Sequence, residues 1–206
     1  GGFRFTRPDD LAAAVIKKLM ADLPQLDPAR IDDLIVGNAM PEAEQGLNMA
    51  RLISLMSFDT VKVPGVTVNR YCASGLETIA IAAAKIHTGL ADVIIAGGAE
   101  SMSFIPMGGF KVTPNLGLTK AHADYYNNMG LTAEAVAEQF KVSREDQDAF
   151  AYQSHMKALA AQKNGRLGAG VIPFEVEEVY LNEKGKRANR KFTVAADEGP
   201  RADTSL

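Results

Sequence analysis

The chain has 206 residues, 47% of them hydrophobic and 23% charged, which is the composition of a folded protein large enough to bury a core. Its formal net charge of -3 argues against nucleic acid or anionic lipid as a partner. No apolar run approaches the roughly 20 residues of a membrane span, and the first residues do not resemble a secretion signal. We therefore expect no nucleic-acid partner, no membrane span, and a location in a bacterial cytoplasm or an organelle matrix.

Helix and strand signals alternate through the first half of the chain. Thr6 as a cap, Pro8 in the first turn and the apolar residues that follow predict a helix that begins near residue 6. Strands that alternate with helices form a mostly parallel sheet with helices on both faces, so we expect an α/β fold. The other predicted elements are strands at residues 31–36, 61–69 and 92–96 and helices at residues 47–57 and 73–87.

The sequence changes character beyond Gly108. The next twenty residues are rich in turn formers and predict a long loop or a boundary. We therefore divide the chain into an α/β core of residues 1–108 and an α+β region of residues 109–206. The pairs Gly97-Gly98 and Gly108-Gly109 are interpreted as tight turns. The later predicted elements are helices at residues 132–140 and 143–164, the second capped by Ser143 with Asp146, and strands at residues 174–181 and 191–195.

Cys72 is the only cysteine in the chain, so it cannot form an internal disulfide. The three scattered histidines have no metal-ligand spacing, so we expect no metal site. Cys72 lies between the strand at residues 61–69 and the helix at residues 73–87, where unpaired backbone N–H groups favour a thiolate. That helix has few charges, which predicts packing on nearly all sides. A small buried thiol is the ordinary alternative, and spacing alone leaves both readings open.

The stretch VNRYCASGLETIAIAAAKIHTGLADVIIAGGAESMS, residues 68–103, resembles the nucleophile region of the thiolase family. Residues 128–134, 143–150 and 198–206 agree with that family independently. The resemblance implies a layered α/β fold with a mostly parallel central sheet in residues 1–108. It also implies an incomplete loop domain in residues 109–206, a missing first strand and a missing C-terminal α/β half. The matching motif residues are Asn69, Arg70, Cys72, Ser74, Gly75, Gly97, Gly98, Glu100, Ser101 and Met102.

The resemblance implies an enzyme, an acetyl-CoA C-acyltransferase of fatty-acid β-oxidation. It would cleave 3-ketoacyl-CoA by thiolysis to acetyl-CoA and a shortened acyl-CoA, with Cys72 as the acyl carrier. Coenzyme A would be a substrate and no cofactor is implied, while acyl-CoA and a second copy of the chain, as a homodimer or homotetramer, would be the partners. The family places its base and its second cysteine in the half that follows, so we expect this segment alone to be inactive. His87, on the order of 20 Å along the helix from Cys72, is not the base.

Two residues of the second region match family positions that contact coenzyme A. Met129 corresponds to a position that lines the pantetheine or acyl entrance, and Arg201 to one at the nucleotide end. A guanidinium suits phosphate groups or a stacked adenine. The ordinary alternatives are a core methionine and a solvated surface arginine.

Asn128 bears on the choice between thiolase subtypes. Short-chain biosynthetic thiolases tend to have histidine there, so Asn128 favours the degradative enzymes, which accept a broader range of acyl chains. A biosynthetic acetoacetyl-CoA thiolase remains an alternative, as does a condensing enzyme of the ketoacyl synthase type. A thiolase-like module that binds lipid without catalysis is the alternative from a different class.

Overall fold

The computed structural model describes residues 1–206, which divide into two compact units. The first unit comprises Gly1–Lys111 and Phe174–Val194, and the second comprises Val112–Pro173 and Ala195–Leu206. The division of the chain at residue 108 that the sequence suggested stays a prediction. None of the helices is both long and apolar enough to cross a lipid bilayer.

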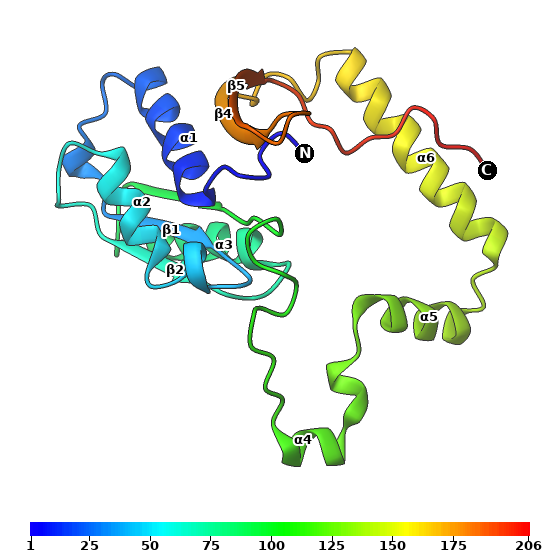
Figure 1. The fold of residues 1–206 in the computed structure, drawn as a ribbon. Coiled ribbons are helices and arrows are strands. Elements are labelled where there is room, and N and C mark those ends of the chain that lie inside the picture. Colours follow the sequence, from blue (N-terminus) through cyan, green and yellow to red (C-terminus); the bar gives the residue numbers. More distant parts are fainter. The chain divides into compact units, whose positions relative to one another are not determined.

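A three-stranded parallel sheet is the centre of the first unit (Figure 1). Its strands lie in the order β2-β1-β3, with bounds Gly65–Val68, Asp33–Gly37 and Ile94–Gly98. Three helices accompany them, α1 (Pro8–Asp22), α2 (Met49–Ser57) and α3 (Ser74–His87), with short 3-10 turns at Pro28–Arg30 and Ala43–Gln45. The α/β fold expected from the sequence is therefore confirmed.

The middle strand β1 is buried throughout and sorts the helices onto the two faces of the sheet. Leu34 and Val36 pack into the main core with Ile16 of α1 and Ile53 of α2. Side chains alternate between faces along a strand, so Asp33 lies on the opposite face. There its carboxylate accepts a hydrogen bond from the Lys85 ammonium of α3 at 2.6 Å. Hence α1 and α2 cover one face and α3 covers the other.

Strand β2 is shorter than the predicted strand at residues 61–69. Pro64 has no N–H to donate to a ladder, and side chains of α2 occupy the carbonyl groups before it. The Arg51 guanidinium donates to the carbonyls of Val61 and Val63, and Ser54 Oγ donates to the Val63 carbonyl at 2.7 Å. Those carbonyls are therefore bonded to a helix instead of a neighbouring strand.

Strand β3 lies two residues later than predicted. The Asp32 carboxylate accepts the backbone N–H groups of Asp92 at 2.7 Å and Val93 at 3.0 Å, so these N–H groups are not available to a neighbouring strand, although the Val93 carbonyl accepts the Asp32 N–H at 2.8 Å. The N–H groups of Val93 and Asp92 lower the pKa of the Asp32 carboxyl. Gly97 and Gly98 pair with β1, so the prediction of a tight turn there is wrong. The turn predicted at Gly108-Gly109 is confirmed, since both residues have positive φ.

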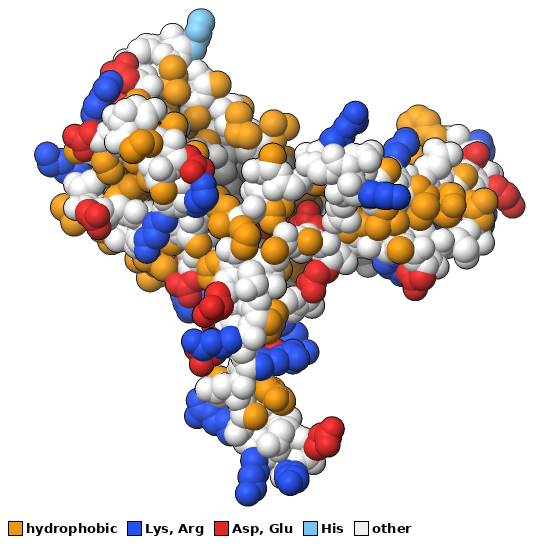
Figure 2. Space-filling model, turned by 90° about the horizontal axis from the view of Figure 1, so that it is seen from above, with side chains coloured by type: hydrophobic (Ala, Val, Ile, Leu, Met, Phe, Trp, Pro, Cys, Tyr) orange, Lys and Arg blue, Asp and Glu red, His pale blue; other side chains and the backbone are white.

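Two local expectations for the helices of this unit are wrong. The cap position of α1 is Arg7, not Thr6, and it makes no side-chain capping bond. Helix α3 was expected to be packed on nearly all sides, but only Ser74, Thr78 and Ala82 are buried. The sheet covers a single stripe of α3, so Leu76, Ile79 and Ile86 are exposed in this chain. Figure 2 shows how many hydrophobic side chains lie open on the face in view.

A hairpin of two antiparallel strands, β4 (Phe174–Leu181) and β5 (Arg187–Val194), also belongs to the first unit. It confirms the strand predicted at residues 174–181, while its partner begins four residues earlier than expected. The Asn182 carboxamide accepts the N–H groups of Lys184 and Lys186 and so closes the turn. The Phe3 ring packs edge-on against Phe174, with 5.8 Å between ring centroids.

The second unit is helical. It contains α4 (Leu116–Ala121), a 3-10 turn at Ala123–Tyr126, α5 (Met129–Phe140) and α6 (Arg144–Lys163). Helix α4 lies in the stretch that was predicted to be irregular, and the Asn115 side chain caps it through the Leu118 N–H at 2.9 Å. The predicted cap of α6 is confirmed, because Ser143 Oγ accepts the Asp146 N–H at 3.1 Å.

Candidate functional site

Cys72 lies in the short loop that connects β2 to α3, and its side chain is exposed. The carboxyl ends of parallel strands meet at one edge of a sheet, so this loop lies at the edge where β1 and β3 also end. Helix α3 begins two residues later, at Ser74. The reading of Cys72 as a small buried packing residue therefore fails in this structure.

The backbone of the loop has an uncommon conformation directly before the cysteine. Tyr71 has φ of 47°, in the left-handed region that non-glycine residues rarely adopt. The Asn69 carboxamide oxygen accepts the Tyr71 N–H at 2.9 Å. Ser74 Oγ accepts the Arg70 N–H at 2.9 Å and donates to the Tyr71 carbonyl at 2.6 Å. Side chains on both sides of Cys72 thus stabilise the turn that presents it.

Two further contacts fix the start of α3. Gly37 at the end of β1 passes so close that a Cβ atom added to it would lie 2.6 Å from the Ser74 carbonyl carbon. The Arg70 guanidinium forms an ion pair with Glu77 in the first turns of α3, with 2.8 Å between Nε and Oε2. The loop is therefore attached both to the sheet and to its own helix.

A second set of hydrogen bonds joins the Cys72 loop to the ends of β1 and β3. The Asn69 amide nitrogen donates to the Ala39 carbonyl at 3.0 Å, and the Ala39 N–H donates to Glu100 Oε2 at 2.6 Å. Gln45, which is fully buried, donates to the other Glu100 oxygen at 2.6 Å. Sequence reasoning matched Asn69 and Glu100 to a motif but did not find Ala39 or Gln45, because no local pattern marks such distant partners.

The two residues expected at a coenzyme A site lie in the second unit. Met129 is the first residue of α5 and is exposed, with Asn128 as the helix cap accepting the Leu131 N–H at 2.9 Å. The Arg201 side chain is exposed, and its backbone N–H donates to His155 Nδ1 at 3.0 Å. Their roles toward coenzyme A stay predictions.

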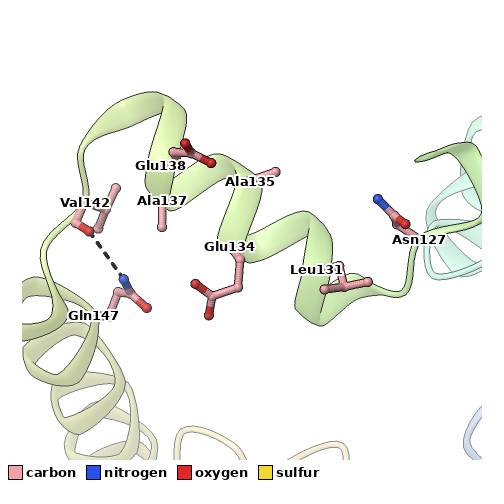
Figure 3. Close-up of a pocket in the computed structure, with 8 residues that line it drawn as sticks. All are labelled: Asn127, Leu131, Glu134, Ala135, Ala137, Glu138, Val142 and Gln147. Atoms are coloured by element: carbon pink, nitrogen blue, oxygen red, sulfur yellow. Dashed lines mark hydrogen bonds between the residues drawn. The ribbon is translucent and has the colours of Figure 1, made fainter. Parts of the chain in front are cut away.

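An open groove of about 550 Å³ lies along α5 and the start of α6. Figure 3 shows the Glu134 carboxylate pointing into the space beside Gln147, whose amide nitrogen donates to the Val142 carbonyl at 3.4 Å. Glu138 adds a second carboxylate to its lining. Two acidic side chains and no cation disfavour the phosphate groups of coenzyme A there.

Similarity to known proteins identifies the protein family of this chain. A family model described as "Thiolase, N-terminal domain" matches residues 1–206. The chain belongs to the thiolase family. This membership sets aside the ketoacyl synthase alternative and confirms the resemblance seen in the Cys72 motif.

Thiolases from bacteria and animals are among its relatives. A 3-ketoacyl-CoA thiolase of Bacillus subtilis (strain 168) is 47% identical over 205 residues, which cover 100% of this chain and 52% of the relative. A beta-ketoadipyl-CoA thiolase of Acinetobacter baylyi is 39% identical over 222 residues, covering 100% and 53%. The peroxisomal 3-ketoacyl-CoA thiolase A of Mus musculus is 39% identical over 207 residues, covering 100% and 47%. The chain thus spans about half the length of these relatives.

Proposed function

We propose that the whole protein is a degradative 3-ketoacyl-CoA thiolase with Cys72 as its nucleophile. The observation that carries this proposal is an exposed thiol in a member of the thiolase family, located in a strand-to-helix turn whose backbone Asn69 and Ser74 stabilise. A nucleophile in such a turn is open to a substrate at the carboxyl edge of the sheet, where α/β proteins bind their ligands.

The proposed reaction has two acyl-transfer steps. In the first, the Cys72 sulfur attacks the β-carbonyl carbon of a 3-ketoacyl-CoA, and the bond between the α and β carbons breaks. The acyl group stays on the sulfur as a thioester, and the α carbon takes a proton and leaves as acetyl-CoA. In the second, the thiol of coenzyme A attacks this thioester, releases the shortened acyl-CoA and restores the Cys72 thiol.

This chain would supply the acyl carrier and part of the oxyanion stabilisation. The backbone N–H of Cys72, two residues before the start of α3, would donate toward the thioester oxygen. The base and the proton-shuttling cysteine would come from outside residues 1–206. Coenzyme A would act as substrate, with no further cofactor, and Met129 and Arg201 would contact it.

Three further parts of the proposal concern the whole protein. A role in fatty-acid β-oxidation is favoured by the 47% identity to a 3-ketoacyl-CoA thiolase. The preference argued from Asn128 adds little, because that side chain caps α5. A homodimer or homotetramer would cover the edge strands β2 and β3, whose outer sides are unpaired in this chain, and sedimentation of a monomer at micromolar concentration would exclude it.

The test is thiolysis by the whole protein with a series of substrates. We expect turnover of 3-ketoacyl-CoA compounds of several chain lengths, with coenzyme A consumed in equal amount to substrate. A 3-oxoadipyl-CoA substrate separates the β-oxidation role from the activity named for the Acinetobacter baylyi relative. Turnover of acetoacetyl-CoA alone would favour the biosynthetic alternative. Absence of thiolysis with every substrate would support a non-catalytic module and overturn the proposal.

A further inference from the structure

A chain of hydrogen bonds connects Glu100, at the end of β3, to the loop that holds Cys72. Glu100 Oε2 accepts the Ala39 N–H at 2.6 Å, and the carbonyl of the same Ala39 accepts from the Asn69 amide nitrogen at 3.0 Å. The Asn69 oxygen in turn accepts the Tyr71 N–H at 2.9 Å. This series of hydrogen bonds ends at the backbone of Tyr71, which has a left-handed conformation and directly precedes Cys72.

The other Glu100 oxygen is held equally firmly. Gln45 Nε2 donates to Glu100 Oε1 at 2.6 Å and to the Met40 carbonyl at 2.9 Å, while Gln45 Oε1 accepts the Ser101 N–H at 2.5 Å. Gln45 is fully buried, so its amide cannot exchange these partners for water. Each carboxylate oxygen of Glu100 therefore has its own donor, Ala39 on one side and Gln45 on the other.

We propose that Glu100 is a positioning residue for Cys72, acting through Ala39 and Asn69. This inference rests on the proposed role of Cys72 as the acyl carrier. We assign Glu100 no direct contact with the substrate. It holds the end of β1 so that the Asn69 carboxamide can support the strained Tyr71 backbone, and that backbone sets the position of the Cys72 sulfur. An acceptor with two oxygens is required at residue 100, because donors approach it from both sides.

The sharpest test is Glu100→Gln in the whole protein. A glutamine has one oxygen and one NH₂ group, so it can accept from Ala39 or from Gln45 but not from both. Rotating Gln45 does not help, since that would break its bonds to Met40 and Ser101. We expect the single-turnover rate of Cys72 acylation to fall about 10-fold to 100-fold, the size of loss that follows from misplacing a reacting group by up to an ångström. The KM for the 3-ketoacyl-CoA should change less than twofold.

Exchanging the two side chains provides the rescue. In Gln45→Glu/Glu100→Gln the glutamine at residue 100 can accept from Ala39 and donate to the carboxyl group at residue 45, which still accepts from Ser101. Because residue 45 is fully buried and faces the Met40 carbonyl, we expect its carboxyl group to be protonated, so that its O–H replaces the former donor to Met40. The double variant should therefore recover most of the acylation rate. Glu44→Gln is the matched control, because it removes one carboxylate from the residue next to Gln45, and Glu44 has no hydrogen bond to Ala39. Its rate should equal that of the unchanged protein.

A second variant covers the case in which Glu100→Gln fails to fold. Asn69→Asp keeps the acceptor for Tyr71 but places a carboxylate against the Ala39 carbonyl, so it should lower acylation in the same way. An acylation rate within twofold of the unchanged protein for a folded Glu100→Gln or Asn69→Asp would overturn the inference, as would a lowered rate without recovery in the exchanged double variant. Failure of the proposed function is distinct, because the unchanged protein would then show no acylation of Cys72.

Discussion

Gly37 and Ser74 approach each other so closely that no side chain fits between them. A Cβ atom on Gly37 would lie 2.6 Å from the Ser74 carbonyl carbon and 2.8 Å from its oxygen, and backbone atoms cannot move aside cheaply. Gly37→Ala should therefore displace the start of α3, lower stability by about 1–3 kcal/mol and slow acylation of Cys72 by up to about 100-fold.

Gly75 offers the matched control for stability. A Cβ atom there would meet nothing within 4 Å, and alanine is the better helix former by about 1 kcal/mol. Thermal unfolding of both variants of the whole protein checks the contrast. Equal unfolding temperatures for Gly37→Ala and Gly75→Ala would contradict the claim that the close approach of Gly37 to Ser74 excludes a side chain.

Ile53 tests the core beneath the sheet. Its side chain is fully buried in the cluster that also contains Leu34 and Met49. Ile53→Ala should lower the free energy of unfolding by about 2–5 kcal/mol, whereas Ile53→Val should lower it by about 1 kcal/mol. Urea denaturation of both variants measures the difference. Equal losses would mean that cavity size does not determine the cost at this position.

The carboxyl group of Asp32 makes the stability of the fold depend on pH in the acidic range. Hydrogen bonds from Val93 and Asp92 lower the pKa of its carboxyl below the usual value of 3.8. The resulting stability is fully present above that usual value and is lost as the pH falls through the folded-state pKa. Asp32→Asn should therefore lower the unfolding temperature at neutral pH, and the difference from the unchanged protein should shrink below about pH 4. Asp59→Asn, a surface carboxylate without such bonds, should show neither effect.

The segment of 206 residues should be inactive on its own. In triad-like sites, loss of the base alone costs several powers of ten in rate, and here the second cysteine would be absent as well. Thiolysis by the segment and by the whole protein should be compared at equal concentration, with circular dichroism to verify that both are folded. Comparable rates would place the base inside the segment, where His122 and His155 are the candidates.

Local sequence signals predicted the elements around Cys72 well. The β-branched run before Cys72 and the alanine-rich pattern after it predicted the β2–α3 turn, and Ser143 predicted the start of α6, because each signal lies within the element that it specifies. The shortening of β2 was not predictable in this way. It depends on Arg51 and Ser54 of a preceding helix, which bind the carbonyls of Val61 and Val63.

The supporting contacts of the candidate site were also beyond local reasoning. Ala39 and Glu100 are 61 residues apart in the chain and meet only because β1 and β3 are adjacent in the sheet. The sequence predicted that helix α3 is packed on nearly all sides, because its composition is apolar. Composition does not say which element covers each face of a helix. In this chain the sheet covers one stripe, and Leu76 and Ile79 are exposed.

The most direct test of the account is the mass of the Cys72 peptide after the whole protein has been mixed with acetyl-CoA and quenched in acid. We expect the peptide to gain one acetyl group, and Cys72→Ala to remain folded but to gain none and to lose thiolysis. Cys72→Ala exchanges one small side chain for another at an exposed position, so its fold should persist. An unmodified Cys72 peptide, or a Cys72→Ala variant with undiminished thiolysis, would contradict the assignment of Cys72 as the acyl carrier.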